Sequence, residues 1–137
     1  MPLDLNQPAN RKVLSYIKRL GAKEWVGVHP DVGDHFARLA AQLIGGVRRS
    51  IRGVRIIAHR KTGTIVAIAF GTTYCVRVGS AVKEARQARL RVSEEFMDGG
   101  KLNVQRTFGP DWFYGAWCAK ERGWIQAVLT AEETEDT

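Results

Sequence analysis

Residues 53–79 read GVRIIAHRKTGTIVAIAFGTTYCVRVG, and this stretch decides the fold. Three runs rich in β-branched residues are separated by Thr62-Gly63 and by Gly71-Thr72. A two-residue loop that contains glycine between two such runs is a strong signal for a β-hairpin. The stretch therefore predicts three consecutive antiparallel strands joined by two tight turns, a meander around which the rest of the chain is organised.

The turns also predict a pairing, Lys61 with Thr64 and Phe70 with Thr73, and side-chain alternation along each strand then assigns every residue to a face. One face is almost wholly apolar and has to be covered by helices; it holds Val54, Ile56, Ala58, Ile65, Ala67, Ala69, Tyr74, Val76 and Val78. The other, which we call the mixed face, has an apolar centre rimmed by cationic or titratable groups; it holds Arg55, Ile57, His59, Val66, Ile68, Phe70, Cys75 and Arg77. A second layer, with the C-terminal hairpin as the candidate, is expected to cover the mixed face; the alternative is an open binding surface.

Two helices are predicted before the meander. Asn10 is expected to cap a helix that runs through Leu20, and Gly21 to end it. A second helix is expected to begin near Asp31 or Gly33, because the apolar residues that follow are spaced three and four apart. These residues are Phe36, Leu39, Ala40, Leu43, Ile44, Val47 and Ile51. Gly45-Gly46 is expected to break this helix or to allow close packing against it.

After the meander, Ser80 is expected to cap a third helix that reaches about Met97 and packs on the apolar face. A further strand is possible within residues 102–108. Residues 112–119 and 124–129 are interpreted as a last hairpin, with Phe113, Trp117 and Trp124 on one of its faces.

Segregated helices and strands predict an α+β fold. The expected architecture has two N-terminal helices, a three-stranded antiparallel meander, a third helix packed on the sheet and a C-terminal aromatic-rich β-hairpin. Residues 1–131 are expected to form a single domain, and residues 132–137 an acidic, disordered tail.

The charge balance predicts an anionic partner. The chain of 137 residues carries 21 Lys and Arg against 14 Asp and Glu, a formal charge of +7. Four of the acids lie in residues 132–137, which leaves 21 basic against 10 acidic side chains, or +11, on residues 1–131. Such an excess favours nucleic acid, an acidic protein surface or phospholipid as the binding partner. The acidic tail is expected to fold loosely over the basic body as an internal competitor.

Other features narrow the class of protein. The sequence holds no run that approaches the roughly 18 apolar residues of a membrane span, and its start lacks the apolar segment of a secretory signal. A cytoplasmic location without membrane contact is therefore expected. Cys75 and Cys118 are interpreted as small buried hydrophobic residues.

Two clusters are candidates for chemistry. His29 and Asp31, with Asp34 and His35, form the densest group of metal-competent side chains, but the acids are better explained by capping and the dipole of a helix N-terminus. His59 and Cys75 share the predicted mixed face, yet lie roughly 10 Å apart by strand spacing, too far for a nucleophile and its base. We therefore expect no metal, no cofactor and no catalytic residues.

The basic side chains are the best functional lead. Arginine outnumbers lysine, which suits bidentate contact with carboxylate or phosphate. The predicted binding residues are Arg48, Arg49, Arg52, Arg55, His59, Arg60, Lys61, Phe70, Arg77, Trp117 and Trp124. They favour a small non-catalytic binding module, a protein–protein adaptor or inhibitor that engages an acidic partner through its Arg and Trp residues. The first alternative is a nucleic-acid-binding protein that uses the same surface, and the second is a small hydrolase or metal-dependent enzyme.

Overall fold

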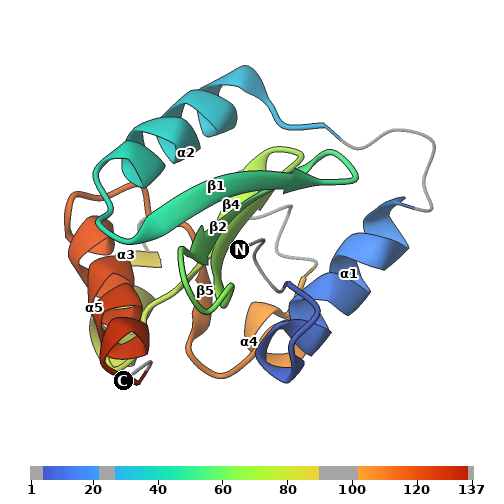
Figure 1. Ribbon diagram of the computed structural model, residues 1–137. Helices are drawn as coiled ribbons and strands as arrows, with labels where there is room; N and C mark the ends of the chain where they lie inside the picture. The colour runs from blue at the N-terminus through green and yellow to red at the C-terminus, as the bar shows by residue number, and fades with distance from the viewer. Residues whose placement is uncertain (1–4, 22–26, 90–101, 136–137) are drawn as a thin grey trace.

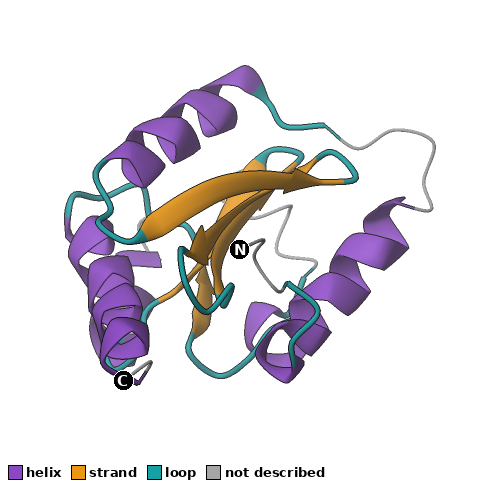
Figure 2. Cartoon of the chain, viewed as in Figure 1, coloured by secondary structure: helices purple, strands orange, loops and turns teal. Residues whose placement is uncertain are grey.

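The computed structural model describes residues 5–21, 27–89 and 102–135. In chain order the elements are η1 (Pro8–Asn10), α1 (Arg11–Gly21), α2 (Pro30–Ala41), β1 (Gly46–Ile51), β2 (Val54–His59), β3 (Ile65–Phe70), β4 (Thr73–Arg77), α3 (Val82–Arg89), α4 (Val104–Thr107), β5 (Trp112–Tyr114) and α5 (Lys120–Glu135). Helices and an antiparallel sheet are combined, so the predicted α+β class is confirmed (Figure 2).

The sheet has five strands in the order β1-β2-β3-β4-β5, and each neighbouring pair is antiparallel. The predicted three-stranded meander is present as β2, β3 and β4. The sheet is wider than predicted, because β1 comes from the stretch assigned to the second helix and β5 from the stretch assigned to the C-terminal hairpin. Both added strands lie at the edges of the sheet.

The second helix ends earlier than predicted. α2 stops at Ala41, and Gly45 adopts a φ of +86°, a left-handed conformation that favours glycine. The chain then turns into β1, where Val47 pairs with Ala58 and Ile51 with Val54. The helical spacing of the apolar residues beyond Ala41 was therefore misleading. The β1–β2 turn is Arg52-Gly53, and both have positive φ, as a type I′ hairpin turn requires.

The first predicted hairpin has a different register. Arg55 pairs with Ala69 and Ile57 with Ala67, and a β-bulge then shifts the pairing so that Ala58 lies opposite Ile65. The loop is longer than Thr62-Gly63. Since a slip of one residue moves a strand's side chains to the other face, the predicted faces of β2 are exchanged relative to β3 and β4. The second hairpin has the predicted register, with Phe70 opposite Thr73.

Helices cover both faces of the sheet (Figure 1). α2, α3 and α5 cover one face and form with it what we call the α2-side core, which includes Phe36, Tyr74, Val76, Ala85 and Ile125. α1 and α4 cover the other face and form the α1-side core, which includes Val13, Ile17, Ile56, Ile68 and Cys75. Every residue of β3 is buried. The mixed face as predicted therefore does not exist as one surface, and helices rather than a hairpin supply the second layer.

The first helix matches its predicted range, but Asn10 has another role. Val13 and Ile17 are buried against the sheet. The Asn10 side chain is fully buried, where its Oδ1 accepts from Ile65 N at 2.8 Å and its Nδ2 donates to Gly63 O at 2.9 Å. Asn10 thus ties the start of α1 to the β2–β3 loop instead of capping its own helix.

The C-terminal part differs most from the prediction. Residues 104–107 form α4 rather than a strand, and residues 120–135 form α5 rather than half of a hairpin. Ile125, Val128 and Leu129 are buried at helical spacing. Helix α5 continues through Glu135, so the first four residues of the predicted tail are helical. The third helix is present as α3, and its predicted extension to Met97 lies outside the described residues.

Within the described ranges, none of the helices has the length and apolar character needed to cross a bilayer.

Candidate functional site

The four predicted binding residues of the mixed face, Arg55, His59, Phe70 and Arg77, do not come together. His59 and Phe70 are buried, and the ring of Phe70 packs against Tyr16. Arg55 lies opposite Ala69 on the α2 side of the sheet. Arg77 leaves the opposite side and forms an ion pair with Asp111 at 3.1 Å. The single binding face expected from Arg55, His59, Phe70 and Arg77 is therefore corrected, because the register of β2 and β3 divides these residues between two faces.

Four of the predicted arginines do gather, at the edge of the sheet that β1 forms. Arg48 and Arg49 lie in β1, Arg52 in the β1–β2 turn and Arg55 in β2, and all four are exposed. We call these four residues the basic edge. Among the described residues, no carboxylate forms an ion pair with any of them. The guanidinium of Arg49 instead donates to Arg48 O at 2.8 Å.

A hollow of about 370 Å³ lies between the basic edge and α2. The hollow is lined by the half-buried Ala37, by Phe36 and Ile56, which are both buried, and by Ser50 and three arginines of the basic edge, Arg48, Arg49 and Arg55. The Arg55 guanidinium lies so close to Gly33 of α2 that a Cβ there would stand 2.6 Å from Nη1. A glycine in α2 thus allows Arg55 to reach the helix, and the hollow combines an apolar surface with three cations.

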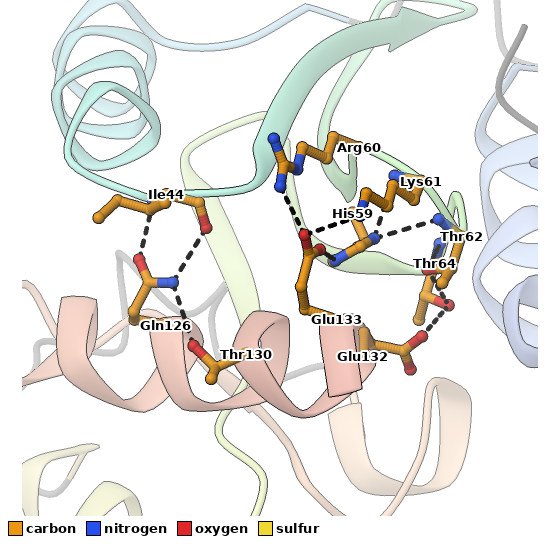
Figure 3. A network of polar contacts seen from close by, with 10 residues as sticks. All are labelled: Ile44, His59, Arg60, Lys61, Thr62, Thr64, Gln126, Thr130, Glu132 and Glu133. Atoms are coloured by element: carbon orange, nitrogen blue, oxygen red, sulfur yellow. Dashed lines mark hydrogen bonds and ion pairs between the residues drawn. The ribbon is translucent and has the colours of Figure 1, made fainter. Parts of the chain in front are cut away.

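Arg60 and Lys61 have a different environment, shown in Figure 3. Glu133 of α5 lies 2.5 Å from Arg60 Nη2 and 3.2 Å from Lys61 Nζ. Hydrogen bonds from Arg60 and then Lys61 lower the pKa of the Glu133 carboxyl to about 2, although desolvation opposes the shift. Two of the predicted binding cations are thus paired with an acid of the chain itself.

His59 belongs to this network as a buried side chain that connects the β2–β3 loop to α5. Its Nδ1 accepts from Lys61 N and Thr62 N, each at 3.1 Å, and its Nε2 lies 2.6 Å from Glu133 Oε2. Since Nδ1 accepts two hydrogen bonds, the ring proton lies on Nε2, the nitrogen in close contact with the carboxylate. Cys75 lies in the α1-side core, while His59 faces α5, so these two residues form no nucleophile and base pair.

Further contacts hold α5 against the sheet (Figure 3). Thr64 Oγ1 donates to Glu132 Oε2 at 3.1 Å. The Gln126 amide bonds both backbone groups of Ile44, accepting from its N at 2.8 Å and donating to its O at 2.9 Å. The acidic end of the chain is therefore docked on the β2–β3 loop through specific contacts.

The predicted tryptophan anchors are only partly exposed. Trp117 and Trp124 both pack against the α2-side core. The ring of Trp117 lies on His35, with 4.5 Å between centroids and 31° between the planes. The hairpin that was expected to present them is absent within residues 102–135, yet Phe113, Trp117 and Trp124 do meet in the same core.

A buried polar cluster was missed by the sequence interpretation. Tyr74 and Glu121 are both buried, and the Tyr74 hydroxyl bonds Glu121 Oε1 and lies 3.1 Å from His35 Nε2. Ala116 N donates to Glu121 Oε2 at 2.6 Å, and Trp117 N to the Tyr74 hydroxyl at 2.9 Å. A tyrosine on an otherwise apolar strand face was the available signal, because a buried phenol usually finds a hydrogen-bond partner.

Burial controls the ionisation of this cluster. Desolvation raises the pKa of Glu121 to about 7, although the hydrogen bonds from Ala116 and Tyr74 oppose the shift. Desolvation and the neighbouring Glu121 charge raise the pKa of the Tyr74 phenol well above its usual range. Desolvation, followed by the Arg38 charge, lowers the pKa of His35. A carboxyl that titrates near neutral pH is often part of a functional site.

The two histidines considered as metal ligands have separate roles. His29 caps α2, with its Nδ1 accepting from Asp31 N at 3.1 Å, and Pro30 follows in the first turn. His35, one and a half turns along, bonds Tyr74 instead. In the described ranges, no three His, Cys, Asp or Glu residues converge in a way that would hold a metal ion.

Comparison of the chain with protein-family models, with curated proteins and with solved structures finds no match.

Proposed function

We propose that the protein is a non-catalytic binding module that holds an acidic segment of a partner protein along the basic edge. The observation that carries the proposal is that Arg48, Arg49, Arg52 and Arg55 gather on adjacent strands with no carboxylate partner among the described residues. Four guanidinium groups with no carboxylate partner in the described part of the chain repel one another, and an anionic ligand relieves that repulsion.

The position of β1 favours an extended peptide as the ligand. β1 is an edge strand, and β2 is its one neighbour in the described sheet. An exposed edge strand can take on another strand through backbone hydrogen bonds, while alternate side chains of that strand enter pockets. An acidic residue of the added strand would meet an arginine of the basic edge, which can form two parallel hydrogen bonds with a carboxylate.

The hollow beside β1 supplies a place for an apolar side chain of the same segment. The half-buried Ala37 supplies apolar surface there, and the three arginines form the charged lining. A partner segment in which acidic residues alternate with aliphatic ones matches both the apolar and the charged parts of this lining. This combination supports an adaptor or inhibitor role rather than a purely electrostatic contact.

Nucleic acid remains the alternative ligand of the same cations. Binding of single strands favours exposed aromatic side chains on which bases stack. Phe36, the one aromatic residue that lines the hollow, is buried, and Trp117 and Trp124 pack against the α2-side core. The acidic protein segment is therefore the preferred ligand, and nucleic acid is an outcome of the test.

The test compares labelled ligands by fluorescence anisotropy across a salt series. The ligands are a peptide of alternating glutamate and valine, single- and double-stranded DNA, and RNA. The variant is Arg48→Glu with Arg55→Glu, and the control is Lys83→Glu with Arg86→Glu, which makes the same charge change on the exposed side of α3. The peptide is expected to bind the native chain and the control, and to lose at least about tenfold in affinity with the basic-edge variant.

Other outcomes contradict the proposal in distinct ways. Preference for DNA or RNA, with a log–log salt slope that reports neutralised phosphates, would support the alternative. Equal loss of peptide binding in both charge-reversed proteins would mean that net charge alone attracts the ligand. No binding of any ligand at low salt would rule out the basic edge as the functional surface.

A further inference from the structure

A second cavity, of about 390 Å³, lies between α2 and the start of α5, on residues other than those of the basic edge. Its lining includes His35 and Arg38 from α2, Trp117 and Cys118 from the β5–α5 loop, and Arg122 from α5. The polar cluster of Tyr74 and Glu121 lies directly behind His35. The cavity thus joins a positively charged lining to a buried proton-carrying group.

The charges that line this cavity are of one sign. Arg38 and Arg122 come from two different helices, and no carboxylate of the described chain forms an ion pair with either. Glu121 precedes Arg122 in sequence, but its carboxyl is turned into the protein, where Tyr74 and Ala116 bond it. Two cations that line one cavity from different helices favour an anion between them.

The wall of the cavity is held in a fixed conformation. Trp117 has a φ of +53°, which is uncommon for a bulky residue and persists only where the surroundings enforce it. Its backbone N donates to the Tyr74 hydroxyl, and that of Ala116 donates to Glu121. Gly115 lies against the Tyr74 ring so closely that a Cβ would stand 2.0 Å from it. These contacts place the Trp117 ring on His35, and strain of this kind is typical of binding sites.

We propose that this cavity binds a small phosphate monoester, with its phosphate between Arg38 and Arg122 and its organic group against Trp117. The planar guanidinium forks suit phosphate oxygens, and the aromatic wall suits an apolar or aromatic substituent. His35 Nε2 bonds Tyr74, which leaves Nδ1 as the nitrogen that donates to the phosphate.

Glu121 in the buried cluster can provide a proton to His35 through Tyr74. When Glu121 is protonated, its hydroxyl donates to the Tyr74 oxygen, and the Tyr74 hydroxyl donates to His35 Nε2. A phosphate dianion in the cavity favours the imidazolium form of His35, so the proton shifts along this chain from Glu121 through Tyr74 to His35. The groups that face His35 are then Tyr74 from β4, Cys118 from the loop, Arg38 from its own helix and Arg122 from α5. The bound phosphate offsets the charges of Arg38 and Arg122, with which no carboxylate of the described residues forms an ion pair.

The experiment follows the imidazole nitrogens of the three histidines by NMR in the full chain. Inorganic phosphate or phenyl phosphate is added at constant ionic strength, with chloride as the reference anion. The His35 signals are expected to shift saturably and the His35 pKa to rise, while those of His29 and His59 stay in place. Phenyl phosphate is expected to bind more tightly than inorganic phosphate, because its ring contacts Trp117.

Variants locate the site. Arg38→Gln or Arg122→Gln is expected to weaken phosphate binding about tenfold or more, and Arg86→Gln on α3 to leave it unchanged. Since all three side chains are exposed, the variants should fold like the native chain. Arg48→Glu with Arg55→Glu is expected to retain phosphate binding, which separates this proposal from that of the basic edge.

The proposal is overturned if the His35 signals respond linearly and no more than those of His29, or if Arg38→Gln and Arg122→Gln bind phosphate like the native chain. Loss of phosphate binding in the basic-edge variant would place the anion elsewhere. Binding of inorganic phosphate without phenyl phosphate would overturn the assignment of a monoester.

Discussion

Gly115 has surroundings that leave no space for a side chain. A Cβ at this position would lie 2.0 to 2.3 Å from three ring atoms of Tyr74, and Tyr74 is itself held by Glu121 and by Trp117 N. Gly115→Ala is therefore expected to lower the free energy of unfolding by at least about 2 kcal/mol, measured by urea denaturation.

Gly123 provides the matched control within the same part of the chain. It lies in α5, and a Cβ there would meet no atom within 4 Å. Gly123→Ala is expected to raise the free energy of unfolding by about 0.5–1 kcal/mol, because alanine is the better helix former. Similar effects of the two substitutions would contradict the crowding at Gly115.

Glu121 makes stability depend on pH in an unusual direction. Its pKa rises from 4.5 to about 7 on folding, so between these pH values the folded chain holds a proton that the unfolded chain has released. The contribution of the protonated Glu121 to the free energy of unfolding is fully present below pH 4.5. It is lost as the pH rises toward 7, by about 3 kcal/mol in total. Glu121→Gln is expected to remove this slope in urea titrations across that range. Glu84→Gln, an exposed glutamate in the first turn of α3, is expected to retain it.

At the scale of the element, β1 is a strand whose apolar residues have the spacing expected of a helix. Its apolar residues continue the three-and-four spacing of α2, yet α2 ends at Ala41, Gly45 turns the chain with a positive φ, and Arg52-Gly53 supplies a type I′ turn. Arg52→Asn is expected to stabilise the β1–β2 hairpin by about 0.5 kcal/mol, because asparagine tolerates positive φ better than arginine. Arg49→Asn within β1 is expected to destabilise, because asparagine is a poor strand former. Thermal unfolding of both variants checks the contrast, and equal effects would contradict it.

The β2–β3 hairpin explains why the predicted binding residues do not share one face of the sheet. Three strands and one of their two registers followed from alternation and from Gly71-Thr72. The other register depended on a bulge beside Val66, for which the sequence carries no glycine or other signal. Because of that bulge the faces of β2 are exchanged relative to β3, so Arg55 and Arg77 lie on opposite faces of the sheet. His59 is buried. Arg48, Arg49, Arg52 and Arg55 stayed together because they are neighbours along one hairpin, whatever the face assignment.

The end of α5 makes the structure sensitive to acid. Hydrogen bonds from Arg60 and Lys61 lower the pKa of Glu133 from 4.5 to about 2. A lowered pKa means that its contribution to stability is present above pH 4.5 and is lost as the pH falls toward 2. Glu133→Gln is expected to unfold more readily than the native chain at neutral pH and to differ less from it at pH 2. Circular dichroism during acid titration measures this, and a constant difference between the two would contradict the role of the Glu133 charge.

At the scale of the whole molecule, the acidic end of α5 lowers the net positive charge that attracts an anionic ligand. The sequence predicted a loose, disordered competitor, whereas Glu132 and Glu133 lie in α5 and make specific contacts with Thr64, Arg60 and Lys61. Deletion of residues 132–137 removes four acids, which raises the formal charge from +7 to +11 and leaves Arg60 and Lys61 unpaired. The long-range attraction for an anionic ligand should increase accordingly.

We expect this deletion to raise the affinity for the glutamate–valine peptide roughly fivefold at low salt, because a surface ion pair that competes with a ligand is worth only a fraction of the ligand's own contacts. The gain should disappear at high salt, where charges separated by more than a Debye length are screened. A full-length chain with Glu132, Glu133 and Glu135 changed to Gln and Asp136 to Asn carries the same charge and keeps the last turn of α5 in the sequence. If it shows the same gain, the acidic end acts through charge. If only the deletion shows it, the helix end itself blocks the surface, and unchanged affinity in both would mean that the acidic end does not regulate binding.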